Sequence, residues 1–267
     1  MLELKKFGAA VRTAVTATAL AAAPIAWSQG LPDFEFAPSG AGLTGSNVTA
    51  DNIIISDYSH VVIAGDGSFT DEGYLAVEGF QLDGSAVVAG GLNTTYGMYF
   101  QFEGTGTQTM NNPFTTANTG TFDTLTFTLY GYNGPSATFG FDGSNNPTIS
   151  GAAGAVALAT GTLDSGAVGT VPVGGSYSPF ASANMTFTIN PAAAEFFASP
   201  EPFYGMVMAA FINTTSQVNV ISPNEFTIFQ GGGSVNFAAP IPEPETYALM
   251  LAGLGVVAFV ARRRRPR

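Results

Sequence analysis

Apolar and polar residues alternate along most of the chain after residue 52, and this pattern constrains the fold more than any other feature. In the clearest run, Leu125, Phe127 and Leu129 alternate with Thr124 to Thr128. Successive side chains of a β-strand point to opposite faces of a sheet, so such runs predict strands with one buried face. Asp83-Gly84 and Asn133-Gly134 are typical hairpin dipeptides, and the latter predicts a hairpin into Thr138 to Phe141. The middle of the chain is therefore expected to be antiparallel β-structure.

About ten to twelve short strands fit this pattern, with no alternation of strands and helices that would favour a parallel sheet. The expected fold class is all-β: an antiparallel β-sandwich or jelly-roll-like domain, flanked by an N-terminal signal helix and a C-terminal transmembrane-type helix. The small-residue stretch Gly151 to Gly169 is read as a strand from Ala155 to Leu163, with a loop as the alternative. One helix is expected at Asn190 to Phe197. The Asn190 side chain can cap its N-terminus, and Pro191 suits its first turn.

Charge is distributed very unevenly. All eight Lys and Arg residues lie near the two ends, and the stretch from Gln29 to Pro240 holds sixteen of the nineteen Asp and Glu residues together with the only His. A surface with a net charge of about −16 repels phosphates, so nucleic acid is not expected as a partner. The absence of cysteine excludes disulfides and a thiol nucleophile.

The N-terminal residues have the three parts of a secretory signal peptide. Lys5, Lys6 and Arg12 are basic, and an apolar run follows from Ala14 to Ala26. Ala26 and Ser28 supply small residues at the two positions that determine cleavage, so cleavage is expected after Ser28. A retained anchor is the alternative, although the apolar run is short for a membrane span. Residues 1–28 are thus assigned to the signal, and residues 29–239 to the secreted domain.

Residues 240–267 form a second address with three parts in fixed order. The sorting motif is Pro242, Glu243 and Pro244. An uncharged apolar run then extends from Tyr247 to Ala261 and is followed by Arg262, Arg263, Arg264 and Arg265. Such an arginine cluster stays on the cytoplasmic side and stops transfer. An ordinary single-pass anchor is the alternative, but it does not require the Pro-Glu-Pro motif.

This tail resembles the PEP-CTERM sorting signal of Gram-negative bacteria. The resemblance implies that exosortase, a membrane cysteine enzyme, processes the chain near the motif. It also implies an exported precursor that is tethered transiently to the membrane and then released to the cell surface or the extracellular matrix.

A second, more diffuse resemblance covers most of the secreted domain. Its aromatic and glycine residues at 73–80, 91–100 and 202–205 are similar to those of the flocculation-associated PEP-CTERM proteins called PepA. This similarity implies a matrix protein that promotes floc and biofilm formation together with exopolysaccharide.

Catalytic motifs are weak. His60 lies in a strand-like run without a marked nucleophile, and no Gly-x-Ser-x-Gly motif occurs. The acids available for glycosidase chemistry are Asp71, Glu72, Glu78, Glu103 and Asp123, which the sequence cannot pair. We therefore expect no enzyme activity and no catalytic residues.

No cofactor is expected, except that Asp66, Asp71 and Glu72 are weak candidates for binding Ca²⁺. Exposed aromatic residues such as Tyr130 and Tyr132 could stack on sugars, although packing within the sheet is the simpler role. The sequence thus favours a non-enzymatic matrix protein. A carbohydrate-binding surface adhesin module is the first alternative, and an exported hydrolase is the second.

Overall fold

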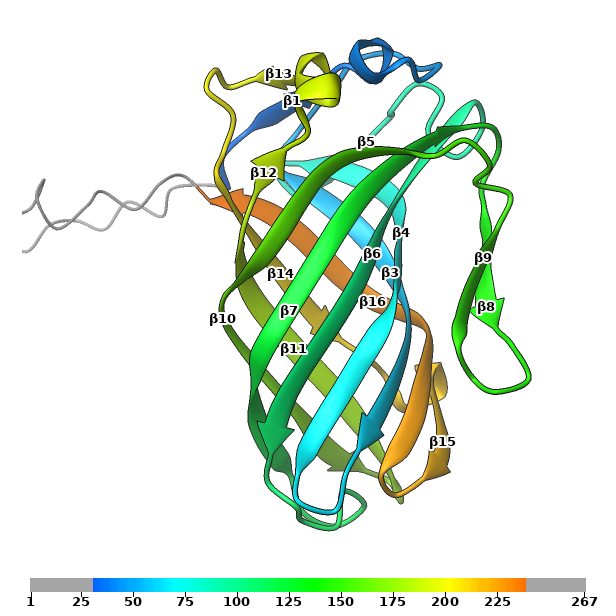
Figure 1. The fold of residues 1–267 in the computed structure, drawn as a ribbon, viewed down its shortest axis with the longest axis vertical. Coiled ribbons are helices and arrows are strands. Elements are labelled where there is room, and N and C mark those ends of the chain that lie inside the picture. Colours follow the sequence, from blue (N-terminus) through cyan, green and yellow to red (C-terminus); the bar gives the residue numbers. More distant parts are fainter. Residues whose placement is uncertain (1–30, 239–267) are drawn as a thin grey trace, which may run out of the picture. The chain divides into compact units, whose positions relative to one another are not determined.

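The computed structural model describes residues 31–238, which belong to one compact unit. Eight long strands form a closed antiparallel barrel in which every strand pairs with its neighbours in the chain order, as Figure 1 shows. Pairing between the first and the last of them closes the barrel. The barrel strands are β3 (Asn52–Ile63), β4 (Ser68–Leu82), β6 (Tyr96–Gln108), β7 (Asn118–Asn133), β10 (Val156–Val173), β11 (Ser176–Thr186), β14 (Met206–Ile212) and β16 (Glu225–Ala238).

Shorter elements surround the barrel. A three-stranded sheet and two 3-10 helices lie at the end that we call the cap end, at the top of Figure 1. The other end, which holds the β3–β4 turn and residues 109–117, is called the turn end. The elements near the cap end are β1 (Phe34–Phe36), η1 (Pro38–Ala41), β2 (Val48–Ala50), β5 (Ser85–Val87), β12 (Thr188–Ile189), η2 (Pro191–Phe196) and β13 (Phe197–Ser199). The remaining ones are β8 (Thr138–Phe141), β9 (Pro147–Ser150), η3 (Thr215–Gln217) and β15 (Val218–Ser222).

The all-β prediction is confirmed, but the predicted β-sandwich is wrong. β16 pairs with β14 on one side and with β3 on the other, so the large sheet has no open edge that would separate it into two layers. Alternation along a strand says which side chains face inward, and this pattern is the same in a sandwich and in a barrel. Closure instead depends on pairing between strands that are far apart in the sequence.

Several local predictions can be compared with the strands directly. The predicted turn at Asp83-Gly84 joins β4 to β5, and both residues have a positive φ. The predicted hairpin after Asn133-Gly134 is wrong, because β8 pairs with β9 and not with β7. The stretch from Ala155 is a strand, as favoured, and extends to Val173. The helix predicted near Asn190 is the short η2, and the Asn190 side chain accepts a hydrogen bond from the Ala192 N–H.

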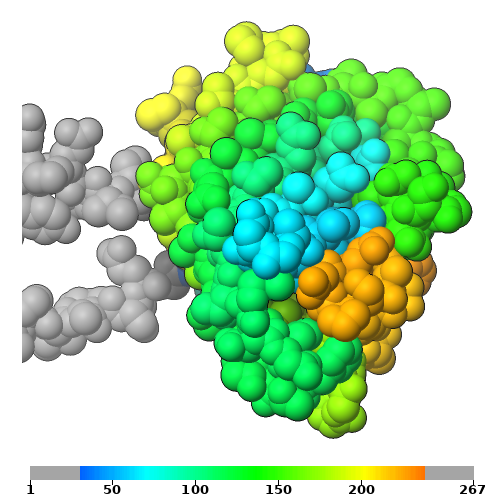
Figure 2. Space-filling view, turned by 60° about the horizontal axis from the view of Figure 1, so that its bottom comes forward, coloured from blue at the N-terminus to red at the C-terminus, as the bar shows by residue number. Residues whose placement is uncertain are grey.

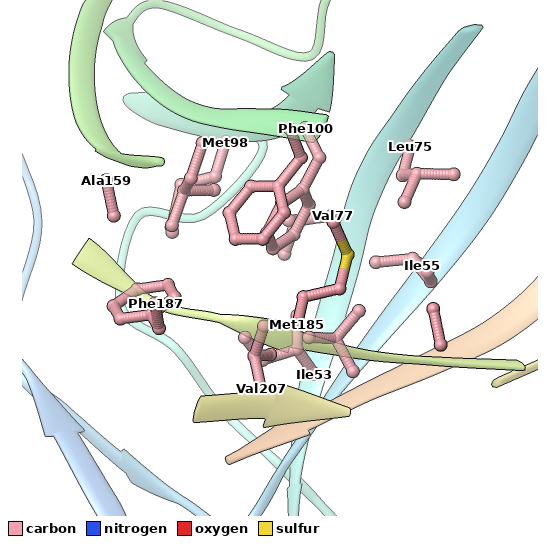
Figure 3. Close-up of a cluster of buried hydrophobic side chains, with 14 of the residues drawn as sticks. Ile53, Ile55, Leu75, Val77, Met98, Phe100, Ala159, Met185, Phe187 and Val207 are labelled. Atoms are coloured by element: carbon pink, nitrogen blue, oxygen red, sulfur yellow. The ribbon is translucent and has the colours of Figure 1, made fainter. Parts of the chain in front are cut away.

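Side chains that face inward fill most of the barrel. Figure 3 shows Ile53, Val77, Met98, Phe187 and their neighbours converging from strands on different sides of the wall. The four residues named are at most 5% exposed. Burial of apolar surface on this scale is the main source of stability for a chain without disulfides or internal basic residues.

Phenylalanines dominate the cap end. Phe36 is fully buried, and its ring contacts six others with centroids between 4.7 and 6.1 Å away: Phe34, Phe80, Phe196, Phe197, Phe203 and Phe237. Most of these pairs are tilted or edge-to-face, which are the favoured aromatic geometries. Residues from β1, η2 and β13 thus close the barrel with apolar side chains.

At the turn end, residues 109–117 lie beside the turn between β15 and β16, which Figure 2 shows in green and orange. The signal peptide and the sorting tail, including the helices predicted there, lie outside the described residues. Among residues 31–238, none of the helices has the length and hydrophobicity that a membrane crossing requires.

Candidate functional site

A strip of aromatic side chains crosses the outer wall of the barrel next to the β8–β9 hairpin. Strand register places Tyr58 of β3 opposite Tyr74 of β4, and Tyr99 of β6 opposite Tyr130 of β7. These residues occupy the alternate positions that face away from the core. We call Tyr58, Tyr74, Tyr99, Tyr130, Tyr132, Phe139 and Phe229 the aromatic strip.

Ring contacts run continuously along the strip. Tyr99 stacks on Tyr130 with centroids 5.1 Å apart and lies 6.0 Å from Tyr74. Phe139 of β8 stacks on Tyr58 at 5.2 Å, and Phe229 meets Tyr58 edge-on at 5.3 Å. The hairpin is therefore held against the wall by an aromatic contact.

The strip borders two hollows. The first, which we call the outer groove, has a volume of about 260 Å³ and is lined by Tyr74, Gln101, Thr128 and Asn146, among others. The second, of about 290 Å³, lies where Tyr132, Phe139 and Phe229 meet. Tyr74 and Tyr130 are half-buried, so part of each ring remains accessible. An aromatic surface with adjacent polar groups is typical of a ligand-binding site.

Two carboxylates face each other in the outer groove. Glu72 of β4 lies directly opposite Glu103 of β6, and both are exposed. Like charges in opposite positions of a sheet are destabilising, which favours a role other than folding. On the same outer face, the His60 imidazole lies 3.1 Å from the Glu225 carboxylate.

The tyrosines of the strip keep their hydroxyl protons. Burial raises the pKa of Tyr99 to about 12, with contributions from the neighbouring tyrosines. Burial also raises the pKa of Tyr74, and the Glu72 carboxylate adds to this effect. At neutral pH these phenols are therefore neutral groups that can both donate and accept hydrogen bonds.

Of the two aromatic residues singled out in the sequence, only Tyr130 has an accessible ring. Tyr132 is 2% exposed, and its hydroxyl accepts a hydrogen bond from the Ala137 N–H, so it has the packing role. Sequence reasoning missed Tyr58, Tyr74 and Tyr99 as members of one surface. Their position on the polar side of the alternation was visible, but their alignment depends on the register between strands.

The three candidate calcium ligands face different directions. Asp66 lies in the β3–β4 turn and accepts hydrogen bonds from Ser68. Asp71 is partly buried and lines the barrel interior, whereas Glu72 faces the outer groove. Within the described part of the chain, no three His, Asp or Glu residues are grouped to hold a metal. Calcium binding remains a prediction.

The acids considered for hydrolysis are brought together only in part. Glu72 and Glu103 are opposite each other, while Asp123 lies elsewhere on β7 and Glu78 lines the second hollow. His60 contacts Glu225 and not a serine in a catalytic arrangement. The geometry thus supplies a carboxylate pair beside aromatic rings.

A family model matches the C-terminal end of the chain. The match is to the PEP-CTERM protein-sorting motif and covers residues 240–265, which confirms the sorting signal predicted from Pro242, Glu243 and Pro244. No curated protein and no solved structure matches the chain. The chain therefore carries a PEP-CTERM sorting motif, which implies an exported protein that exosortase sorts.

Proposed function

We propose that the barrel is a non-enzymatic component of the extracellular matrix that binds exopolysaccharide through the outer groove and promotes floc or biofilm formation. In this proposal the precursor is tethered to the membrane by residues 247–265 until exosortase cuts near Pro242 to Pro244. The barrel then reaches the cell surface or the matrix.

The observation that carries the proposal is the aromatic strip beside opposed carboxylates. The apolar C–H face of a sugar ring packs well against an aromatic face. Carboxylate and amide oxygens, such as those of Glu103 and Gln101, accept hydrogen bonds from sugar hydroxyls. A groove on the outer wall suits a polymer better than an enclosed pocket does.

Binding to exopolysaccharide isolated from the producing cells tests this site. Tyr74→Ala and Glu103→Gln should each weaken binding about tenfold or more in calorimetry, because the first removes the ring and the second removes the charge that strengthens the acceptor. Asp123→Asn is the charge-matched control, since Asp123 is exposed on β7 away from the groove. Equal binding by all three variants and the unmodified protein would exclude the outer groove as the polysaccharide-binding site.

The same experiment addresses the hydrolase alternative. We expect the polymer to keep its length after prolonged incubation with the protein, as judged by size-exclusion chromatography. Shortening that disappears in Glu72→Gln or Glu103→Gln would instead assign the carboxylate pair to glycoside hydrolysis.

Sorting is tested separately in cells. Glu243→Ala, or deletion of Arg262 to Arg267, should leave the protein in the cell envelope and reduce its amount in the matrix. Release of both variants at the normal level would remove exosortase from this account without affecting the sugar-binding proposal.

A further inference from the structure

The turn-end half of the barrel interior contains a cavity that the proposed function does not use. Its volume is about 100 Å³, and its wall is mostly aromatic and aliphatic, with Phe69, Phe122, Phe127 and Phe226 among the rings. Leu75, Phe100, Met185 and Val207 of the packed cluster in Figure 3 also line it. The cavity therefore begins where the close packing of the cap-end half stops.

Four buried oxygen atoms in this wall have no hydrogen-bond partner among residues 31–238. They are Oδ1 of Asp57, Asp71 and Asn213 and Oγ1 of Thr170. Asp57, Thr170 and Asn213 are at most 5% exposed. Buried polar groups in folded proteins almost always have partners, and each one left without a partner costs about 1–3 kcal/mol. These oxygens therefore indicate a missing donor or cation.

No positive side chain of the barrel can supply that partner. The sequence has no Lys or Arg between residues 13 and 261. The single His, His60, lies on the outer face of β3 with Glu225 as its partner. The charged groups that act on Asp71 are the carboxylates of Asp57 and Glu72, and the Ser59 hydroxyl lies near Asp57. Residues 31–238 therefore offer no cation for these carboxylates.

We propose that this cavity binds a small organic cation, between methylammonium and tetramethylammonium in size. Faces of aromatic rings attract such cations, most strongly where water is excluded. Once ionised, Asp57 and Asp71 provide the opposite charge. At about 30 Å³ per water molecule, the cavity has room for roughly three waters or one cation of this class.

A small hollow at the turn end borders the cavity and shares Gln108, Thr170 and Phe226 with it. Its outer rim is formed by Met110 and Pro113 of residues 109–117 and by Asn224 of the β15–β16 turn, the two segments that are adjacent in Figure 2. Separation of these two segments would open the interior without breaking a barrel strand.

Calorimetric titration of the secreted protein with tetramethylammonium chloride at pH 8 tests the proposal. We expect saturable binding, with tert-butanol as the neutral analogue and potassium chloride as the ionic control each binding at least tenfold more weakly. Asp57→Asn should reduce the affinity at least tenfold, and Asp71→Asn should act in the same direction. Asp123→Asn, on the outer wall, should leave it unchanged.

Proton release provides a second readout, which does not depend on how well a variant folds. Burial raises the pKa of Asp57 to about 7, against a smaller lowering by Ser59, and Asp71 has its pKa raised well above the usual range. A bound cation favours the ionised form, so binding at pH 6 should release protons and affinity should fall at least tenfold from pH 8 to pH 5. Absence of saturable binding, or equal binding of tert-butanol, would overturn the proposal and leave a cavity that holds only water.

Discussion

The two halves of the barrel interior have the same wall but different contents. At the cap end, rings from β1, η2, β13 and β16 fill the space around Phe36. At the turn end, Asp57, Asp71 and Thr170 face a cavity, and each has a side-chain oxygen without a hydrogen-bond partner in residues 31–238. Both halves are built by the same alternation of inward and outward side chains. The difference indicates that the cap end provides most of the stability. The turn end is less stable because its interior contains polar groups without partners.

The largest expected effect is at the cap end. Phe36→Ala removes a fully buried ring with six aromatic neighbours and should lower the free energy of unfolding by about 3–5 kcal/mol. Phe229→Ala is the matched control, because that ring is 48% exposed and should cost far less. Denaturant unfolding of both variants measures the contrast. If the two variants lost similar amounts of unfolding free energy, the cap end would not be the more stable half.

The turn end should make stability depend on pH. The pKa of Asp57 rises from 3.8 in the unfolded chain to about 7 in the folded one, so the folded state binds more protons between these values. Stability should therefore fall as pH rises from 4 to 7, by a few kcal/mol at about 1.4 kcal/mol per pKa unit. Asp57→Asn should flatten this dependence, which melting temperatures from pH 4 to 8 would detect, whereas Asp123→Asn should retain it.

Glycine-to-alanine substitutions test how closely side chains pack against the barrel wall between the two halves. A Cβ at Gly161 would collide with the Phe127 ring and the Thr186 carbonyl. Gly161→Ala should therefore lower the free energy of unfolding by about 1–3 kcal/mol. Gly79→Ala is the control, because a Cβ there has no neighbour within 4 Å. If the two substitutions had equal effects on unfolding, the close packing of Phe127 against the wall would be refuted.

The smallest effect is expected at the edge of the cap end. The Asn190 side chain caps η2 through the Ala192 N–H and donates a 2.9 Å hydrogen bond from Nδ2 to the Ala157 carbonyl. Asn190→Ala should lower the free energy of unfolding by about 1 kcal/mol. Asn190→Asp restores the capping acceptor but not the donor, so unfolding of the two variants separates the two bonds.

The sequence predicted strands well and their assembly poorly. Residues such as Leu125, Phe127 and Leu129 revealed their buried face because alternation is a local property. Closure and the aromatic strip both depend on register between strands, which no local pattern contains. The interior acid was partly visible, since Asp57 has the same parity as the apolar Ile55 and Val61.

Closure by the first and last barrel strands has a consequence for export. The barrel closes only when residues 225–235 pair with residues 52–63, so we expect nearly the whole domain to be exported before closure. The matched sorting motif begins at residue 240, directly behind the closing strand. We therefore expect the last step of folding to coincide with arrival of the sorting motif at the membrane. In kinetic terms, a barrel that closes slowly would expose unpaired strands while exosortase acts, and processing and folding would compete.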